Sequence, residues 1–381
     1  MLSKADIASV LSGYDTTRLT IAVLGSHSAL EVCRGAWEEG ILNLAVCQKD
    51  RDKTYSRYYR SRTLKATGRK VGTIDEVMLL DKFSDLISDD IRRQLKIKNA
   101  IFVPNRSFSV YVPYADIEER FDVPIFGNRG MLHAEERTAA KSQHYLMEKA
   151  GLAMPRRFES PDKIDSLAIV KAPEAARSYE RSFFFAASPQ EYLQKAGELL
   201  ASGKVTQEGL ASATIEEFVV GTQVNFNFFY SPLSQEIELM GTDTRRQTNL
   251  DGLLRLPAPQ QEEVLKRVSP TYIEVGHIAA TVRESLLAKA FDAAEKLVEA
   301  AKKEFAPGII GPFALQTAVV SEGGKEKILT FDLSLRIPGS PGVTATPYTH
   351  YLYGQSVSYG RRIAMEIKDA VRINKLEEVV T

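Results

Sequence analysis

The sequence predicts a mixed α/β and α+β fold that is divided into more than one domain. An apolar run at 19–24, a helical pattern at 28–39 and a second apolar run at 42–47 give the βαβ order of a parallel sheet. Near the C-terminus, two apolar runs flank Gly323-Gly324, which is typical of an antiparallel hairpin. A chain of 381 residues with 44% hydrophobic residues can bury the core of more than one such unit.

Composition excludes several classes of protein. The 49 basic and 49 acidic residues leave a formal net charge of +0, so no bulk field attracts nucleic acid or a membrane. The first residues lack an apolar signal core, and no uncharged run is long enough to span a bilayer. Cys33 and Cys47, the 2 cysteines, fit reduced packing thiols better than a disulfide or a zinc site. We therefore expect a cytoplasmic protein in which any anion site is local.

The first strand is followed by a turn with the sequence GSHSA at 25–29. Gly25 allows a sharp bend there, and Ser28 can cap the helix that follows. Backbone amides at such a helix start favour a bound phosphate. His27 can add a hydrogen bond or a positive charge to that ligand, or it can simply satisfy nearby backbone groups, and the spacing alone leaves both interpretations open.

Residues 48–70 contain nine Lys or Arg residues with three interleaved tyrosines, a composition that can contact single-stranded nucleic acid. Two aspartates dilute the charge and no nucleic-acid motif accompanies it, so a solvated loop, or one that attracts a phosphorylated small molecule, is favoured. A further strand at 99–104 leads into a polar loop at 105–108 that contains Ser107. Ligands collect at such strand ends in α/β sheets.

A second domain is expected to begin near Val123-Pro124. A helix is predicted from about Glu135 to Ala150, before Gly151. The apolar run 167–171 predicts a short strand that ends in Lys171, which can either contact an α- or β-phosphate or point to water. The segment that follows, 172–182, has no glycine and is therefore not a P-loop.

Two further strands are predicted around Gly221. The strand before it carries paired glutamates at 216–217, and the strand after it alternates amides with apolar residues over 223–228. Such an amide-rich face needs partners, which can be a heterocyclic carboxamide or the amides themselves. Residues 243–252 are expected to form a polar loop, and an amphipathic helix is expected just after 283–285, running to about 304.

The sequence FDLSLR at 331–336 indicates a site for metal-bound phosphate. In a strand, Asp332, Ser334 and Arg336 project from one face as a carboxylate, a hydroxyl and a guanidinium. The hairpin at Gly323-Gly324 would bring Gln316 alongside as a second oxygen ligand, and Mg²⁺ shares such ligands with nucleotide phosphates. A solvated strand face with an isolated aspartate is the alternative, and the spacing does not decide between them.

Eight motifs, in order between about residues 20 and 372, resemble those of the PurP family. This family comprises ATP-grasp ligases that make FAICAR from AICAR (5-aminoimidazole-4-carboxamide ribonucleotide), formate and ATP. The motifs are 25–29 (GSHSA), 123–129 (VPIFGNR), 216–221 (EEFVVG), 229–232 (FYSP), 249–252 (NLDG), 283–287 (RESLL), 308–313 (GIIGPF) and 360–364 (GRRIA).

The resemblance implies an N-terminal Rossmann-like pre-ATP-grasp domain followed by a two-lobed ATP-grasp fold. The corresponding boundaries are 1–124 for the N-terminal domain, 125–220 for lobe A and 221–381 for lobe B with the metal site. A homo-oligomer is also implied. Formate would attack the γ-phosphate of ATP to give formyl phosphate, and the AICAR amine would then attack the formyl carbon, in the pathway to IMP.

The resemblance also assigns roles to residues. AICAR would bind at His27, Ser107 and Asn249. ATP would bind at Lys171 and at the hinge residues Glu216, Glu217, Phe218 and Val219. Mg²⁺ or Mn²⁺ would bind at Gln316 and Asp332, and Arg336, together with Lys171, would stabilise the transferred phosphate.

Three differences from the family pattern motivate other hypotheses. Many members carry a glycine-rich loop where 174–181 is charged and glycine-free, and Asp332 stands where glutamate is usual. A proline-rich segment, 337–342, replaces a Gly-Thr-Asn loop. The alternatives are an ATP-grasp ligase with another acid or amine, and a nucleotide-binding regulator without turnover.

Overall fold

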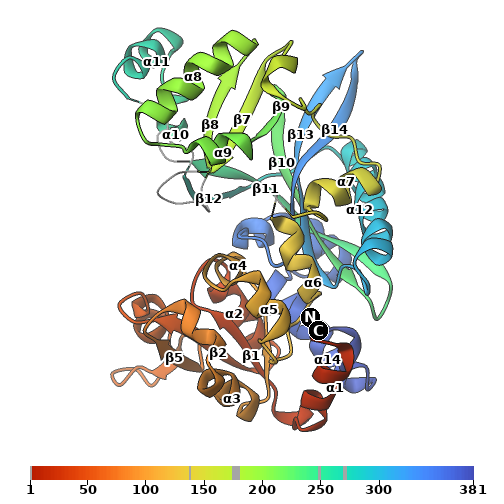
Figure 1. The fold of residues 1–381 in the computed structure, drawn as a ribbon. Coiled ribbons are helices and arrows are strands. Elements are labelled where there is room, and N and C mark those ends of the chain that lie inside the picture. Colours follow the sequence, from red (N-terminus) through yellow and green to blue (C-terminus); the bar gives the residue numbers. More distant parts are fainter. Residues whose placement is uncertain (1, 137–138, 174–180, 248–249, 269–272) are drawn as a thin grey trace.

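The computed structural model describes residues 2–136, 139–173, 181–247, 250–268 and 273–381, and its strands form four sheets. A four-stranded sheet at one end of the molecule and a three-stranded sheet at the other are joined by a five-stranded sheet between them (Figure 1). The remaining sheet is a two-stranded ribbon of β3 (Arg62–Thr63) and β4 (Lys70–Val71). It belongs to the basic segment, in which Tyr58 and Tyr59 are exposed and Tyr55 is buried.

The N-terminal sheet is parallel, as the βαβ pattern predicts, with the order β5-β2-β1-β6. All five residues of β1 are buried, which explains its uninterrupted apolar sequence. The strands are β1 (Thr20–Leu24), β2 (Leu42–Gln48), β5 (Glu76–Leu80) and β6 (Ala100–Phe102), and the crossover helix is α2 (Ala29–Glu38).

The C-terminal helix α14 (Tyr359–Arg372) returns to this sheet and packs on α2, near both chain ends (Figure 1). A Cβ atom at Gly35 of α2 would lie 1.9 Å from the backbone of Gly360, so only glycine permits this approach. Apolar residues of α14 therefore share one core with those of β1 and α2. A contiguous division of the chain at 124 and 220 stays a prediction.

The three-stranded sheet is antiparallel, with the order β8-β7-β9, and it packs against α8. Its strands are β7 (Ala168–Pro173), β8 (Arg181–Ala186) and β9 (Thr214–Glu217), and its helices are α8 (Pro189–Ala201) and α9 (Gln207–Ala211). The strand predicted to reach Gly221 ends at Glu217, and a short connection leads to the next sheet.

The five-stranded sheet is antiparallel and has the order β12-β11-β10-β13-β14. Its apolar face packs against α12 (Glu284–Glu304), where the rings of Phe228 and Phe291 lie 5.4 Å apart. The predicted hairpin at Gly323-Gly324 is confirmed, and both glycines have positive φ angles, 57° and 76°. The strands are β10 (Thr222–Ser231), β11 (Glu236–Gln247), β12 (Glu274–Ala279), β13 (Gly311–Glu322) and β14 (Lys325–Ser334).

The single helix predicted from 135 to 150 is wrong. The chain forms α6 (Arg129–Leu132) and α7 (Gln143–Lys149), and Ser142 starts α7 by accepting a hydrogen bond from the amide of Tyr145. The side chains of Glu135 and Gln143 instead accept hydrogen bonds from backbone amides of the β14 segment, at Leu335 and Leu333. These tertiary contacts override the helical periodicity.

Four local predictions also need correction. Residues 243–246 belong to β11 and are not a loop, and 106–108 begin α4 (Arg106–Tyr111). Ser28 occupies the helix-capping position of α2, but its hydroxyl donates to the carbonyl of Pro338 (2.6 Å). The left-handed residue of the first turn is His27 (φ 49°), whereas Gly25 is needed because a Cβ there would lie 2.4 Å from the Cys47 sulfur.

The remaining helices complete the domains. None of the helices within the described residues combines the length and the apolar composition that a membrane span requires. The α-helices not yet introduced are α1 (Lys4–Ser12), α3 (Asp89–Ile97), α5 (Tyr114–Glu119), α10 (Leu250–Leu253), α11 (Ala258–Leu265) and α13 (Tyr348–Tyr353).

Candidate active site

Gln316 and Asp332, the residues predicted to bind metal, lie directly opposite each other on β13 and β14. The predicted proximity of these two side chains is therefore confirmed as geometry. The Gln316 amide donates to the hydroxyl of Ser334 (3.3 Å), so Ser334 shares their face of the sheet. A β-bulge follows Gln316 in the pairing and locally increases the twist of the hairpin.

This polar row continues across the sheet. Asn225 of β10 pairs with Gln316 on one side and with Asp243 of β11 on the other. The amides of Asn225 and Asn227 both donate to the fully buried carboxylate of Asp243, at 3.0 and 2.6 Å. The predicted amide-rich face therefore has a carboxylate as its partner in this structure.

A histidine between two carboxylates extends the row to the edge strand β12. His277 makes hydrogen bonds to Asp243 through Nδ1 and to Glu274 through Nε2 (2.8 Å). Burial opposes the charged imidazole, but the hydrogen bonds to Asp243 and then Glu274 outweigh it and raise the pKa of His277 to about 9. His277 is therefore a buried cation near pH 7.

Arg245 connects this histidine cluster to the predicted metal pair. Its Nη2 donates to Oε1 of Gln316 (2.6 Å), and its Nε lies 3.2 Å from Glu274. None of Arg245, Asp243, His277 and Glu274 was predicted from the sequence as a site residue, because residues 243–246 were interpreted as a loop and no strand was predicted over 274–279. The alternation of Asp243 and Arg245 at strand spacing was the signal that could have found two of them.

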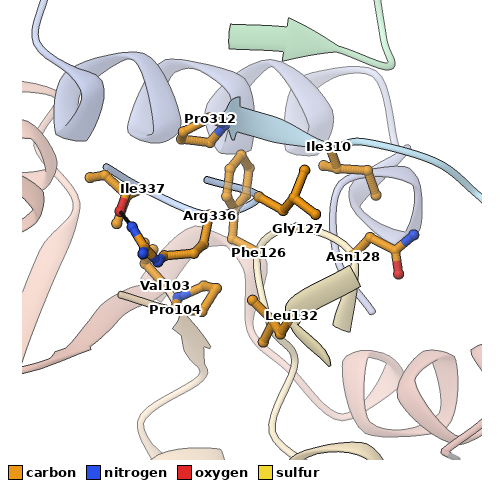
Figure 2. Close-up of a pocket in the computed structure, with 11 residues that line it drawn as sticks. Val103, Pro104, Phe126, Gly127, Asn128, Leu132, Ile310, Pro312, Arg336 and Ile337 are labelled. Atoms are coloured by element: carbon orange, nitrogen blue, oxygen red, sulfur yellow. Dashed lines mark hydrogen bonds between the residues drawn. The ribbon is translucent and has the colours of Figure 1, made fainter. Parts of the chain in front are cut away.

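Arg336 is buried at the end of β14, where it forms an ion pair with Glu135 (3.2 Å) and donates to the carbonyl of Ile337. Burial lowers the pKa of Arg336, and the negative charge of Glu135 opposes this effect. Arg106 lies 3.6 Å from the same carboxylate. Figure 2 shows Arg336 beside a small pocket whose other lining residues are Val103, Pro104, Phe126, Gly127, Asn128, Leu132, Ile310, Pro312, Leu335 and Ile337.

His27 lies against the chain that follows Arg336. A Cβ at Gly339 would be 2.2 Å from Cε1 of His27, so the imidazole occupies the space that a side chain there would need. The His27 side chain keeps contact with solvent, yet desolvation and then the charge of Arg336 lower its pKa to about 4. The imidazole is therefore neutral near pH 7 and can offer a hydrogen bond, but not the positive charge considered from the sequence.

Ser107, the second residue predicted to bind AICAR, is buried in the first turn of α4. Asn105 connects this turn to the His27 loop, because its amide donates to the carbonyls of Leu24 and Ser26, each at 2.9 Å. The third predicted residue, Asn249, lies outside the described residues, as do 174–180 of the charged segment.

Lys171 does not point to water. Its ammonium is buried in β7, donates to the carboxylate of Glu216 in β9, and lies 5.7 Å from the ring centroid of Phe331 in β14. The three-stranded and five-stranded sheets therefore meet at this lysine. The predicted hinge, 216–219, begins at Glu216. The backbone amides of Glu217 and Phe218 donate to backbone carbonyls. The Phe218 ring centroid lies 4.7 Å from that of Phe185, and Val219 is partly buried.

The donor set suits a hard divalent cation that shares its ligands with a substrate. Across the described residues, no three His, Cys, Asp or Glu side chains are grouped closely enough to hold a metal ion. Asp332 and the oxygen of Gln316 would hold the ion from one side only. Mg²⁺ is usually bound in this way, by one or two protein oxygens together with phosphates and water.

The fold is the ATP-grasp fold, a class of enzymes that generally use ATP and a divalent metal. The chain is similar to N5-carboxyaminoimidazole ribonucleotide synthetase (purK, ADP complex), with a TM-score of 0.56, 13% identity and coverage of 86% of this chain and 72% of that one. It is more similar to an IMP biosynthesis protein PurP from Thermococcus kodakaraensis, with a TM-score of 0.68, 28% identity and coverage of 95% and 100%.

The chain belongs to the family of 5-formaminoimidazole-4-carboxamide-1-(beta)-D-ribofuranosyl 5'-monophosphate synthetases. It is 38% identical over 378 residues to the protein of this name from Methanobrevibacter smithii (99% of this chain, 98% of that one). It is also 38% identical over 381 residues to the Methanopyrus kandleri protein, with full coverage of both chains. Two family descriptions match as well, "Domain of unknown function (DUF1297)" at 191–381 and "Protein of unknown function (DUF1246)" at 21–158. The predicted family is thus confirmed.

Proposed function

We propose that this protein formylates AICAR to FAICAR with formate and ATP, releasing ADP and phosphate, in the biosynthesis of IMP. FAICAR is the ribonucleotide in the names of its full-length relatives. The observation that carries the proposal is the cross-strand pair of Gln316 and Asp332 beside Arg245 and Arg336. This arrangement of oxygen ligands and guanidinium groups suits a metal-bound phosphoryl group.

ATP would lie between the three-stranded and five-stranded sheets. The 216–219 segment would contact the adenine, and Lys171 would contact a phosphate while Glu216 fixes its position. Asp332 and Gln316 would hold Mg²⁺ or Mn²⁺, which would neutralise charge on the β- and γ-phosphates. In phosphoryl transfer the protein mainly positions groups and neutralises charge, so no covalent nucleophile is needed.

Two chemical steps would follow in this site. A carboxylate oxygen of formate attacks the γ-phosphorus, the bond to ADP breaks, and formyl phosphate forms. The AICAR amine then attacks the formyl carbon, phosphate leaves, and the nitrogen loses a proton. Arg336 would stabilise charge on the transferred phosphate. Water must be excluded because formyl phosphate hydrolyses readily.

AICAR would bind at the end of the N-terminal sheet. His27 would offer a neutral imidazole and Ser107 a hydroxyl, and Asn249 would complete the site. The backbone amides at the start of α2, beside His27, would favour the ribonucleotide phosphate. The proposal includes a cytoplasmic location, because the two free thiols suit a reducing compartment. It also includes a homo-oligomeric state and domain boundaries at 124 and 220.

The test is ADP release by the purified protein with ATP, Mg²⁺, formate and AICAR, omitting each component in turn and following FAICAR by mass. We expect product only when all substrates are present, and none with Asp332→Ala. ADP without FAICAR would direct the search to another acid or amine. ATP binding without ADP would instead indicate a nucleotide-binding regulator and overturn the proposal.

A further inference from the structure

Arg245 donates a hydrogen bond to the oxygen that a metal ion would need. Gln316 has one side-chain oxygen, and it accepts a hydrogen bond from Nη2 of Arg245 at 2.6 Å, while its nitrogen donates to Ser334. A divalent cation bound to this oxygen would lie within a few ångströms of the guanidinium. Two positive charges at that separation repel strongly in a partly buried site, so the two cannot share Oε1 without a change in position.

The position of Arg245 also places it between the two ends of the site. Arg245 contacts Gln316 on the side of the predicted metal pair and Glu274 on the other side, where His277 adjoins. The charges of Glu274 and His277 act on His27, so that end of the site borders the expected AICAR position. Formate has to meet both the γ-phosphate and the AICAR amine, and it must therefore bind in the interval that Arg245 spans.

The chemistry of this side chain suits a small carboxylate. A guanidinium presents parallel N–H donors that match the two oxygens of a carboxylate. The Nε of Arg245 is buried and makes no hydrogen bond within the described residues, although it is in ion-pair range of Glu274. Arg336 also has a buried Nε without a hydrogen bond within the described residues, but it is less suited, since its side chain is only 8% exposed and is held by Glu135 and the Ile337 carbonyl.

We propose that Arg245 takes the place of the metal at Gln316 and that arrival of the metal–nucleotide complex releases its guanidinium to bind the carboxylate of formate. This inference rests on the proposed function for the identity of the acid. It assigns Arg245 as the residue that recognises formate. It also gives an order of binding, in which the metal–nucleotide precedes the acid.

The test compares Arg245→Gln with Arg246→Gln, its neighbour on the opposite face of β11, which lies 3.5 Å from Asp251. Mn²⁺ binding to the nucleotide-free protein, followed by electron paramagnetic resonance, should be several-fold tighter in Arg245→Gln because Oε1 is freed. The KM for formate should rise about 10- to 100-fold, as expected for a lost hydrogen bond to a charged group, with little change in the KM for ATP. Arg246→Gln should change neither.

Arg245→Lys separates charge from shape. It should keep the weak Mn²⁺ binding of the wild type, because the positive charge remains, but it should not restore the KM for formate, because one ammonium cannot pair with both carboxylate oxygens. Unchanged Mn²⁺ affinity in Arg245→Gln, or an unchanged KM for formate, overturns the inference. The Mn²⁺ measurement needs no turnover, so a wild-type protein that fails to make FAICAR refutes the proposed function separately.

Discussion

Replacement of His277 by asparagine tests whether the buried charge cluster of the five-stranded sheet exists as described. His277 is held between Asp243 and Glu274, with the Ser340 hydroxyl 3.4 Å from Nδ1, and its charge acts on His27. Its imidazolium offsets the charge of Asp243 and, together with Arg245, that of Glu274. Asparagine keeps a hydrogen-bonding group of similar size but cannot carry the charge.

The magnitude follows from the difference between the folded and unfolded pKa values. The pKa of His277 is about 9 in the folded protein and 6.5 in a model peptide. Since each pKa unit corresponds to about 1.36 kcal/mol, protonation of His277 stabilises the fold by up to about 3 kcal/mol. A raised folded pKa gives stability that is fully present below pH 6.5 and is lost as the pH rises through about 9.

The assay is urea unfolding of both proteins at pH 6, 8 and 10. The stability advantage of the wild type over His277→Asn should be about 3 kcal/mol greater at pH 6 than at pH 10. His350→Asn, which removes an exposed histidine from α13, provides the control for loss of an imidazole. If the difference in unfolding free energy between wild type and His277→Asn stays constant across this pH range, His277 is not a charged, buried histidine.

Three further predictions concern single contacts. Gly339→Ala should raise the KM for AICAR with a smaller effect on the KM for ATP, because the new Cβ displaces the His27 ring; equal effects on both would contradict this. Gly35→Ala should destabilise the protein by about 1–3 kcal/mol in thermal or urea unfolding, because the new Cβ meets the backbone of α14. The control is Gly197→Ala, in open space on α8, which should be neutral or slightly stabilising. Lys171→Met should abolish ATP binding in calorimetry and leave a buried carboxylate without its cation, and unchanged affinity would exclude Lys171 from the ATP site.

The part of the site that could be predicted from the sequence lies on one hairpin, formed by β13 and β14. The proximity of Gln316 and Asp332 could be predicted because the Gly323-Gly324 turn fixes the register of the two strands that it connects. The Asp243–His277 contact could not, since it depends on which strands are neighbours and the end of β11, from residue 243, was interpreted as a loop. Ser28 shows the same limit, because its actual partner, Pro338, is 310 residues away in the chain. Periodicity reports a local preference, whereas a tertiary hydrogen bond can override it.

Glu135 connects the edge of the five-stranded sheet to the chemistry of the site. β14 is an edge strand, and the chain at its end has backbone amides without a neighbouring strand. One carboxylate oxygen of Glu135 accepts from the Leu335 amide at 2.8 Å, and the other pairs with Arg336 at 3.2 Å. A single buried glutamate therefore fixes both the backbone that carries Arg336 and the direction of its guanidinium. Each arginine has two partners, but the Arg336 side chain is 8% exposed whereas that of Arg245 is 34% exposed, so Arg245 has more room to exchange partners when substrates bind.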